Sequence, residues 1–103
     1  MAYSNPQQGH PEAPALRKRA GAWLQQLRKD AELTQNALSK QLGFEYYTMV
    51  SQVESGKTRV PPDKMQAWAE ALGQDPREFV KTLLRYYDPY TWQILFGGRE
   101  VRR

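Results

Sequence analysis

The feature of this sequence that most constrains its fold is the spacing of its apolar residues, which recur three and four positions apart. Between residues 15 and 31 they fall on one stripe of a helix, and polar residues fill most other positions. The stripe consists of Leu16, Ala20, Trp23, Leu24, Leu27 and Ala31. No long stretch alternates polar and apolar residues as a half-buried strand does. The spacing therefore predicts an all-α fold with a first helix over 15–31.

Four further helices are predicted from the residues that begin and end them. Thr34 is an N-cap candidate for the second helix. Three helices each end at a glycine, which adopts backbone conformations that other residues disfavour. They span residues 35–42 before Gly43, 46–55 before Gly56, and 62–72 before Gly73. A fifth helix begins at Asp75-Pro76, since proline suits the first helical turn, and Asp88-Pro89 interrupts it.

These elements divide the chain of 103 residues into four parts. Residues 1–14, which are rich in proline and side-chain amides, predict a mobile leader. Residues 15–87 predict one compact helical domain, followed by a short helical aromatic segment over 88–97. Residues 98–103 form a basic tail.

Composition excludes several kinds of functional site. The chain has no cysteine, and its single histidine, His10, lies in the predicted leader, so thiolate or histidine metal sites and His-based catalysis are excluded. No catalytic nucleophile–base pair or phosphate-binding glycine loop can be assembled, so we expect no enzyme, no cofactor and no metal. There is no apolar run of about 18 residues and no secretory signal, so we expect a cytoplasmic protein.

Positive charge is concentrated in the middle of the chain. The formal net charge is +4, and residues 16–60 hold eight Lys and Arg against four Asp and Glu. Residues 61–96 hold four basic residues against five acidic ones. A basic segment permits nucleic-acid binding, although an ordinary solvated helix surface explains the charge equally well.

A helix, a tight glycine-containing turn and a second helix form the helix-turn-helix arrangement. Three motifs in the predicted helices resemble those of the phage repressor/Cro-type (XRE) helix-turn-helix family. They are LTQNALSKQLG at Leu33–Gly43, VSQVESGK at Val50–Lys57 and AWAEALG at Ala67–Gly73. The resemblance covers about residues 16–84. It implies a five-helix lambda-repressor-like domain that binds double-stranded DNA sequence-specifically and regulates transcription.

The resemblance also implies roles for residues of the first three helices. Gln35 resembles the family's phosphate-contacting glutamine, because a side-chain amide and free helical N–H groups favour an anionic oxygen. Arg28 and Glu54 match an ion pair that ties the first helix to the end of the third. Such a pair fixes orientation more than it adds stability, because desolvation offsets the attraction. An ordinary exposed glutamine and two solvated charges are the alternatives.

The third helix is implied to read DNA bases. Its DNA-facing positions are Tyr47, Thr48, Met49, Ser51 and Gln52, whereas Val50 and Val53 point inward. Gln52 can form two hydrogen bonds with adenine, and Tyr47, Thr48 and Met49 can touch thymine methyls or phosphates. Core packing is the alternative for Tyr47 and Met49. Because this face carries no arginine, we expect a half-site that leans toward A·T pairs.

The sequence departs from the family pattern just before this helix. Eleven steps separate Gly43 from Glu54, one more than the usual pattern has. The additional residue lies within Phe44–Tyr47 and lengthens either the turn or the start of the third helix. The assignment of base contacts at Tyr46 and Tyr47 depends on which of the two is lengthened.

Basic residues are predicted on both flanks of the reading helix. Lys57, Thr58 and Arg59 follow it at the place where family members contact the DNA backbone, and charges on a loop suit phosphate without reading sequence. Arg17, with Lys18 and Arg19 beside it, lies at the start of the first helix. These three either reach flanking DNA or are solvated.

The end of the chain is unusually aromatic, and a domain this small cannot bury all of it. An exposed apolar patch usually marks an interface. Because helix-turn-helix repressors of this kind bind as two-fold dimers, we expect a homodimer contact here. The predicted contact consists of Tyr86, Tyr87, Tyr90, Trp92, Ile94 and Phe96. The alternative is that this segment folds back over the first and fifth helices.

The sequence thus leads to a dimeric repressor that occupies a pseudo-palindromic operator and excludes polymerase. No sensor domain fits beside the helices, so we expect no small-molecule ligand. One alternative is an antitoxin-type repressor whose C-terminal segment binds a toxin protein. Another is a protein-interaction module that has lost DNA binding, although the retained Gln35, Gln52, Lys57 and Arg59 argue against it.

Overall fold

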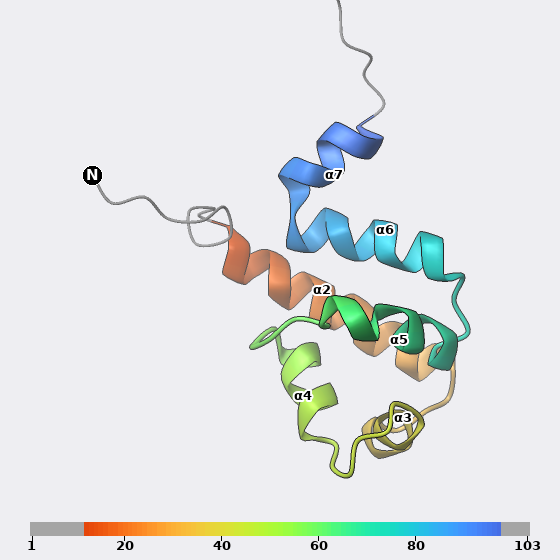
Figure 1. The fold of residues 1–103 in the computed structure, drawn as a ribbon. Helices are drawn as coiled ribbons and strands as arrows, with labels where there is room; N and C mark the ends of the chain where they lie inside the picture. The colour runs from red at the N-terminus through yellow and green to blue at the C-terminus, as the bar shows by residue number, and fades with distance from the viewer. Residues whose placement is uncertain (1–11, 98–103) are drawn as a thin grey trace, which may run out of the picture.

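The computed structural model describes residues 12–97, in which helices and turns make up the chain and no strand occurs (Figure 1). The predicted all-α, lambda-repressor-like fold is confirmed. None of the described helices is long and apolar enough to cross a membrane. Residues 1–11 of the predicted leader and the predicted tail 98–103 lie outside the described residues. The elements are α2 (Ala13–Asp30), α3 (Gln35–Gln41), α4 (Thr48–Ser55), the 3-10 helix η1 (Pro62–Lys64), α5 (Met65–Ala71), α6 (Pro76–Tyr87) and α7 (Pro89–Phe96).

The residues predicted to begin and end helices do so in the structure. The Thr34 hydroxyl oxygen accepts a hydrogen bond from the Ala37 N–H at 3.0 Å, and an Asp75 carboxylate oxygen accepts one from the Glu78 N–H at 3.0 Å. The three predicted stop residues have left-handed φ angles of 84°, 85° and 72°, at Gly43, Gly56 and Gly73 respectively. Each side-chain cap contributes about 1 kcal/mol to helix stability.

Three helix starts differ from the prediction. α2 begins at Ala13, inside the predicted leader, with a proline in its first turn. α4 begins at Thr48 rather than at residue 46, so the additional residue lengthens the turn and not the helix. The predicted fourth helix starts as the 3-10 turn η1 and becomes α-helical at Met65. Pro61 precedes another proline and is extended, with ψ of 143°, so the chain enters this helix through a tight first turn.

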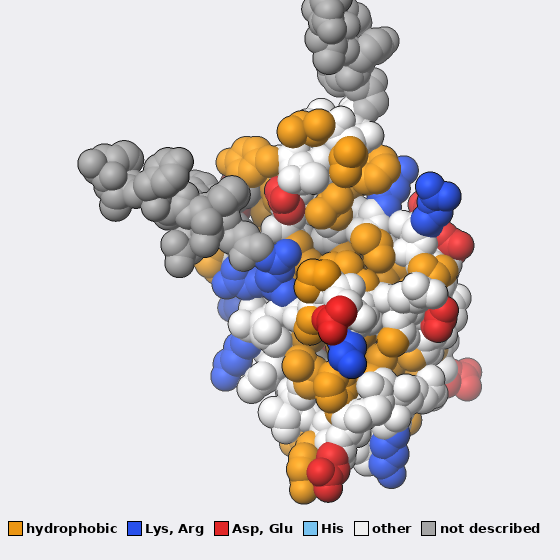
Figure 2. Space-filling view, in the orientation of Figure 1, with side chains coloured by type: hydrophobic (Ala, Val, Ile, Leu, Met, Phe, Trp, Pro, Cys, Tyr) orange, Lys and Arg blue, Asp and Glu red, His pale blue; other side chains and the backbone are white. Residues whose placement is uncertain are grey.

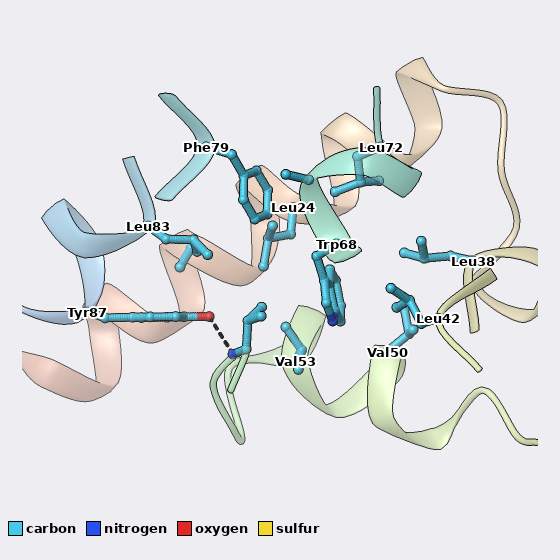
Figure 3. Close-up of a cluster of buried hydrophobic side chains, with 13 residues drawn as sticks. Leu24, Leu38, Leu42, Val50, Val53, Trp68, Leu72, Phe79, Leu83 and Tyr87 are labelled. Atoms are coloured by element: carbon cyan, nitrogen blue, oxygen red, sulfur yellow. Dashed lines mark hydrogen bonds between the residues drawn. The ribbon is translucent and has the colours of Figure 1, made fainter. Parts of the chain in front are cut away.

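The hydrophobic core is centred on Trp68 of α5, which is fully buried (Figure 3). Each helix from α2 to α6 contributes buried apolar side chains around it: Leu24 from α2, Leu38 from α3, Val50 and Val53 from α4, and Phe79 and Leu83 from α6. Trp23 of α2 extends the core by stacking on Phe79, with 5.4 Å between ring centroids. Because burying one large apolar side chain contributes about 1.5–3 kcal/mol, this core holds the five helices together.

α2 and α4 cross with their backbones in contact. A Cβ atom on Gly21 would lie 2.1 Å from the carbonyl oxygen of Glu54, and one on Gly56 would lie 2.8 Å from the Cα of Lys18. Neither position has room for a side chain, so glycine is what permits the approach. Sequence reasoning assigned glycines to helix ends and overlooked Gly21. A glycine in the middle of an otherwise regular helix was the available signal, because it costs about 1 kcal/mol relative to alanine.

α7 packs on α6 through one of its faces. The cations of Lys81 and Arg85 lie 4.9 Å and 4.7 Å from the ring centroids of Phe96 and Trp92. The two rings are themselves 6.1 Å apart. The residues of the other face are exposed: Tyr90, Ile94 and Leu95. Hydrophobic side chains therefore gather at the α7 end of the molecule (Figure 2).

Gly21→Ala tests the close approach of α2 and α4. Alanine normally stabilises a helix interior by about 1 kcal/mol relative to glycine. Here the added Cβ would meet the α4 backbone, so we expect the free energy of unfolding to fall by about 2–3 kcal/mol, as in an overpacked core. Urea denaturation followed by circular dichroism measures this change.

Gly43→Ala is the comparison without a steric clash. Unlike Gly21, Gly43 has a left-handed φ, of 84°, and no atom lies within 4 Å of a Cβ added there. Its loss should therefore be limited to the conformational cost of about 1–2 kcal/mol. A gain in stability for Gly21→Ala would contradict the backbone contact.

Candidate nucleic-acid interface

A buried ion pair connects the elements of the predicted DNA-binding unit. Arg28 of α2 donates from Nε to Glu54 Oε2 at 2.7 Å and from Nη2 to Glu54 Oε1 at 3.1 Å. Its Nη1 donates to the carbonyl oxygen of Leu33, in the loop before α3, at 2.8 Å. Gln35, the first residue of α3, donates from Nε2 to Glu54 Oε1 at 3.0 Å. The network thus joins α2, the following loop, α3 and α4.

The burial of this ion pair indicates that it orients the helices more than it adds to the stability of the fold. The side chains of Arg28 and Glu54 are only 9% and 2% exposed, so both charges have lost most of their hydration. Two parallel N–H···O contacts and the additional bonds to Leu33 and Gln35 replace it. Because desolvation offsets much of the attraction, the pair chiefly fixes how α3 and α4 lie against α2.

Gln35, the predicted phosphate contact, belongs to this network. Its side chain is half-buried, and one amide hydrogen is directed to Glu54. An amide nitrogen carries two hydrogens, so one donor is left for an outside acceptor. The ion pair therefore holds this side chain in one orientation at the start of α3.

α4 has one buried side and one exposed side. Val50 and Val53 are fully buried in the core, as predicted. Thr48 and Gln52 are exposed, and so is Tyr47 at the N-cap position. The other two predicted base-contacting residues, Ser51 and Met49, are half-buried. Met49 packs against the core. The structure thus brings the predicted set together on one helix, with Met49 at its inner edge.

The loop after α4 carries the predicted phosphate contacts. The N–H groups of Lys57 and Thr58 both donate to the Gln52 carbonyl oxygen, at 3.0 Å and 3.3 Å, so the loop folds back on the end of α4. Lys57 is exposed. The Arg59 guanidinium lies 4.7 Å from the centroid of the Tyr87 ring, a cation–π contact that restrains this side chain.

Arg17 of α2 joins the same surface. Its Nε donates to the carbonyl oxygen of Gly56 at 3.3 Å, which places the basic start of α2 beside the loop. Figure 2 shows Lys and Arg side chains gathered over this part of α2. The four predicted flanking residues therefore lie around the end of α4. They come from two distant parts of the chain: Arg17 belongs to α2, and Lys57, Thr58 and Arg59 belong to the loop after α4.

The predicted C-terminal contact does not form one surface. Tyr87 is only 7% exposed, and its hydroxyl oxygen accepts a hydrogen bond from the Val60 N–H at 3.1 Å (Figure 3). Assigning Tyr87 to an exposed contact was therefore wrong, because it follows Phe79 and Leu83 at intervals of four on the inner stripe of α6. That spacing was a signal in the sequence. Burial also raises the pKa of Tyr87, so its hydroxyl stays protonated at neutral pH.

The other predicted members of the contact are divided among three environments. Tyr86 is half-buried and lies 6.0 Å from the Trp23 ring. Trp92 and Phe96 stand next to the cations of α6. Tyr90, Ile94 and Phe96 stay exposed, at 58%, 83% and 40%.

Asp88 separates α6 from α7. Its carboxylate accepts hydrogen bonds from the Thr91 N–H at 3.1 Å and from the Thr91 hydroxyl at 2.5 Å. These bonds favour the ionised form and lower the pKa of Asp88. The carboxylate thus caps α7 at neutral pH. No group of three or more potential metal ligands occurs among residues 12–97.

Arg28→Met tests the role of the ion pair. It would leave the Glu54 carboxylate buried without its cation, so we expect the free energy of unfolding to fall by about 3–5 kcal/mol. The double variant Arg28→Met/Glu54→Leu removes both charges and should lose much less than the sum of the two single variants. Urea denaturation of the wild type, Arg28→Met, Glu54→Leu and the double variant gives the values. Strictly additive losses would be inconsistent with a coupled pair.

Comparison with known proteins agrees with this geometry. The family model described as "Helix-turn-helix", which represents the XRE-type family, matches residues 24–79. The matched region includes Arg28, Gln35 and Glu54, all of α4, and the loop that follows it. No curated protein was found to match the chain. Because the match covers more than half of the sequence, the chain belongs to the XRE-type helix-turn-helix family and is a DNA-binding transcriptional regulator.

Proposed function

We propose that this regulator recognises a specific duplex by placing α4 in the major groove. The observation that carries the proposal is the division of α4 into a side packed on the core and a side with Thr48 and Gln52 exposed. The major groove is wide enough to admit an α-helix. Because the buried pair of Arg28 and Glu54 holds α4 against α2, the exposed side is presented without further rearrangement.

In this proposal, base contacts come from the exposed side of α4. Gln52 forms two hydrogen bonds with an adenine, and Thr48 and Tyr47 lie against thymine methyls or nearby phosphates. Ser51 and the outer edge of Met49 complete the contact. The absence of arginine from α4 favours A·T pairs in each half-site.

Phosphate contacts surround this reading surface. Lys57, Thr58 and Arg59 come from the loop after α4, Arg17 comes from α2, and Gln35 comes from the start of α3. Their proximity in the fold supports a common backbone contact that sets the register of α4 without reading sequence.

Gln52→Ala separates base reading from backbone binding. In DNA selected from a random pool by the wild-type protein, we expect this variant to lose about 1–3 kcal/mol of binding free energy, concentrated at one base pair of each half-site. Lys57→Ala, at an exposed position of the loop, should instead weaken binding evenly across sequences. Binding isotherms on the selected duplex and its single-base variants measure both effects.

Salt dependence gives the control for this experiment. With about four phosphate contacts per subunit, a dimer should show a slope near −7 for log affinity against log salt. Lys57→Ala should reduce the slope by about 1 for each copy bound, and Gln52→Ala should leave it unchanged. A flat salt response of the wild-type protein would contradict DNA backbone binding.

We propose further that the protein binds as a homodimer through α7. The exposed face of this helix carries Tyr90, Ile94 and Leu95, and no residue of Pro89–Phe96 is charged. An apolar surface of this kind usually marks an interface. A two-fold dimer would place two copies of α4 on half-sites about one helical turn apart, on a pseudo-palindromic operator. Occupying such an operator would exclude polymerase, which makes the protein a repressor.

Ile94→Lys tests the dimer contact. The side chain is 83% exposed, so the substitution should leave the fold intact while placing a charge in the proposed interface. We expect light scattering at tens of micromolar to show a monomer in place of the dimer. Ala22→Lys, at an exposed position of α2, should remain dimeric. A wild-type protein that stays strictly monomeric, both free and on DNA, would rule the proposal out.

A second candidate function is that of an antitoxin that represses its own operon. The observation that favours it is a groove of about 630 Å³ beside α7, whose apolar lining includes Met65, Val80 and Leu84 together with Leu95 and Phe96. A toxin could occupy this groove and the exposed face of α7. Co-purification of a defined complex with the product of a neighbouring small gene would favour this function over a simple repressor.

A further inference from the structure

We propose that Tyr46, at the tip of the turn between α3 and α4, is a further specificity-determining residue whose ring contacts a thymine methyl at the edge of the α4 footprint. The proposal rests on the DNA-binding function given above and extends it beyond α4 itself. It gives a role to a residue of Phe44–Tyr47, the stretch within which this turn exceeds the family pattern.

Backbone hydrogen bonds hold both ends of the turn, and the residues between them are exposed. On the α3 side, the N–H groups of Gly43 and Phe44 donate to the carbonyl oxygens of Lys40 and Ser39, at 3.1 Å and 2.9 Å. The Phe44 side chain also packs against the core. On the other side, the Ser51 N–H donates to the Tyr47 carbonyl oxygen at 3.0 Å, which begins α4. Glu45 and Tyr46 lie between these anchors in the sequence. The turn that joins α3 to α4 projects below both helices in Figure 1.

Tyr46 is the most exposed aromatic side chain of the described residues, at 68%, and Tyr47 beside it is 53% exposed. Within residues 12–97, the Tyr46 side chain makes no hydrogen bond, ion pair or ring contact. No polar or ring contact within the described residues therefore ties this ring to the fold, whereas the preceding aromatic residue, Phe44, packs against the core. Tyrosine suits a contact surface because it offers a large apolar area with few rotatable bonds to order.

The position of the ring relative to α4 identifies what it would meet. Reading helices contact base edges mainly through their N-terminal residues, and Tyr46 comes two residues before the first residue of α4. A side chain at this place would reach the groove just beyond the bases that Thr48 contacts.

The neighbouring charge favours a base contact over a phosphate contact. Glu45 is exposed and lies next to Tyr46, so a turn pressed against the DNA backbone would bring a carboxylate close to phosphates. Within the groove, the apolar group that a ring can meet is the C5 methyl of thymine. The ring, rather than the hydroxyl, is therefore the contacting part of Tyr46.

Two variants of Tyr46 test this inference on the duplex that the wild-type protein selects from a random pool. Tyr46→Ala should bind this duplex about tenfold more weakly and lose its preference at one T·A pair of each half-site, a pair that Gln52→Ala still discriminates. Tyr46→Phe keeps the ring and should bind within about twofold of the wild type. Thermal unfolding should be unchanged in both, because the side chain is exposed.

The outcomes separate this inference from the function on which it rests. Wild-type affinity and base preference in Tyr46→Ala would overturn the inference while leaving DNA binding by α4 intact. Equal losses in Tyr46→Phe and Tyr46→Ala would also overturn it, because the hydroxyl would then be the contacting group. If the wild-type protein selects no duplex at all, the proposed function itself fails.

Glu45→Gln supplies an independent readout of where the tip lies. Removing a negative charge next to the duplex should raise affinity for all sequences alike, and this gain should shrink as salt is added. An affinity that does not change at any salt concentration would place the tip away from the DNA and overturn the inference.

Discussion

The contact between α2 and α4, backbone against backbone, sets the orientation of α4 in this protein. At Gly21 and Gly56 the backbones of the two helices come closer than any side chain would allow. The buried pair of Arg28 and Glu54 then fixes the rotation of α4 and the start of α3 about this contact. Burial of the apolar core supplies most of the stability, but it is non-directional. The orientation of α4 therefore depends on a steric constraint and a polar one acting on the same two helices.

The loop that follows α4 connects the proposed DNA-contacting surface to the C-terminal helices. Arg59 lies over the Tyr87 ring, and the neighbouring Val60 N–H donates to the Tyr87 hydroxyl. Tyr87 is the last residue of α6, and Asp88 after it caps α7. Tyr87 thus lies between the loop that carries proposed phosphate contacts and α7, which carries the proposed dimer contact.

Much of the fold followed from local signals. Thr34 and Asp75 cap the helices they were predicted to cap, and the glycines after α3, α4 and α5 end them. The arginine–glutamate pair followed from the family resemblance, and its two residues do meet. Gly21 and Tyr87 were misjudged, the first because it was not considered and the second because an aromatic residue near a chain end was taken to be exposed. Both residues owe their roles to partners more than 25 positions away.

The sequence by itself determined where helices begin and end, which side of each is apolar, and which family the motifs resemble. These properties depend on residues within one or two helical turns of each other, so a single sequence displays them. The tertiary structure alone decided that α2 touches α4 at Gly21, that the Tyr87 hydroxyl accepts a hydrogen bond from the Val60 N–H, and that the additional residue lengthens the turn before α4. Those outcomes depend on how closely packed helices can approach and on which buried polar groups find partners, and no local pattern encodes either.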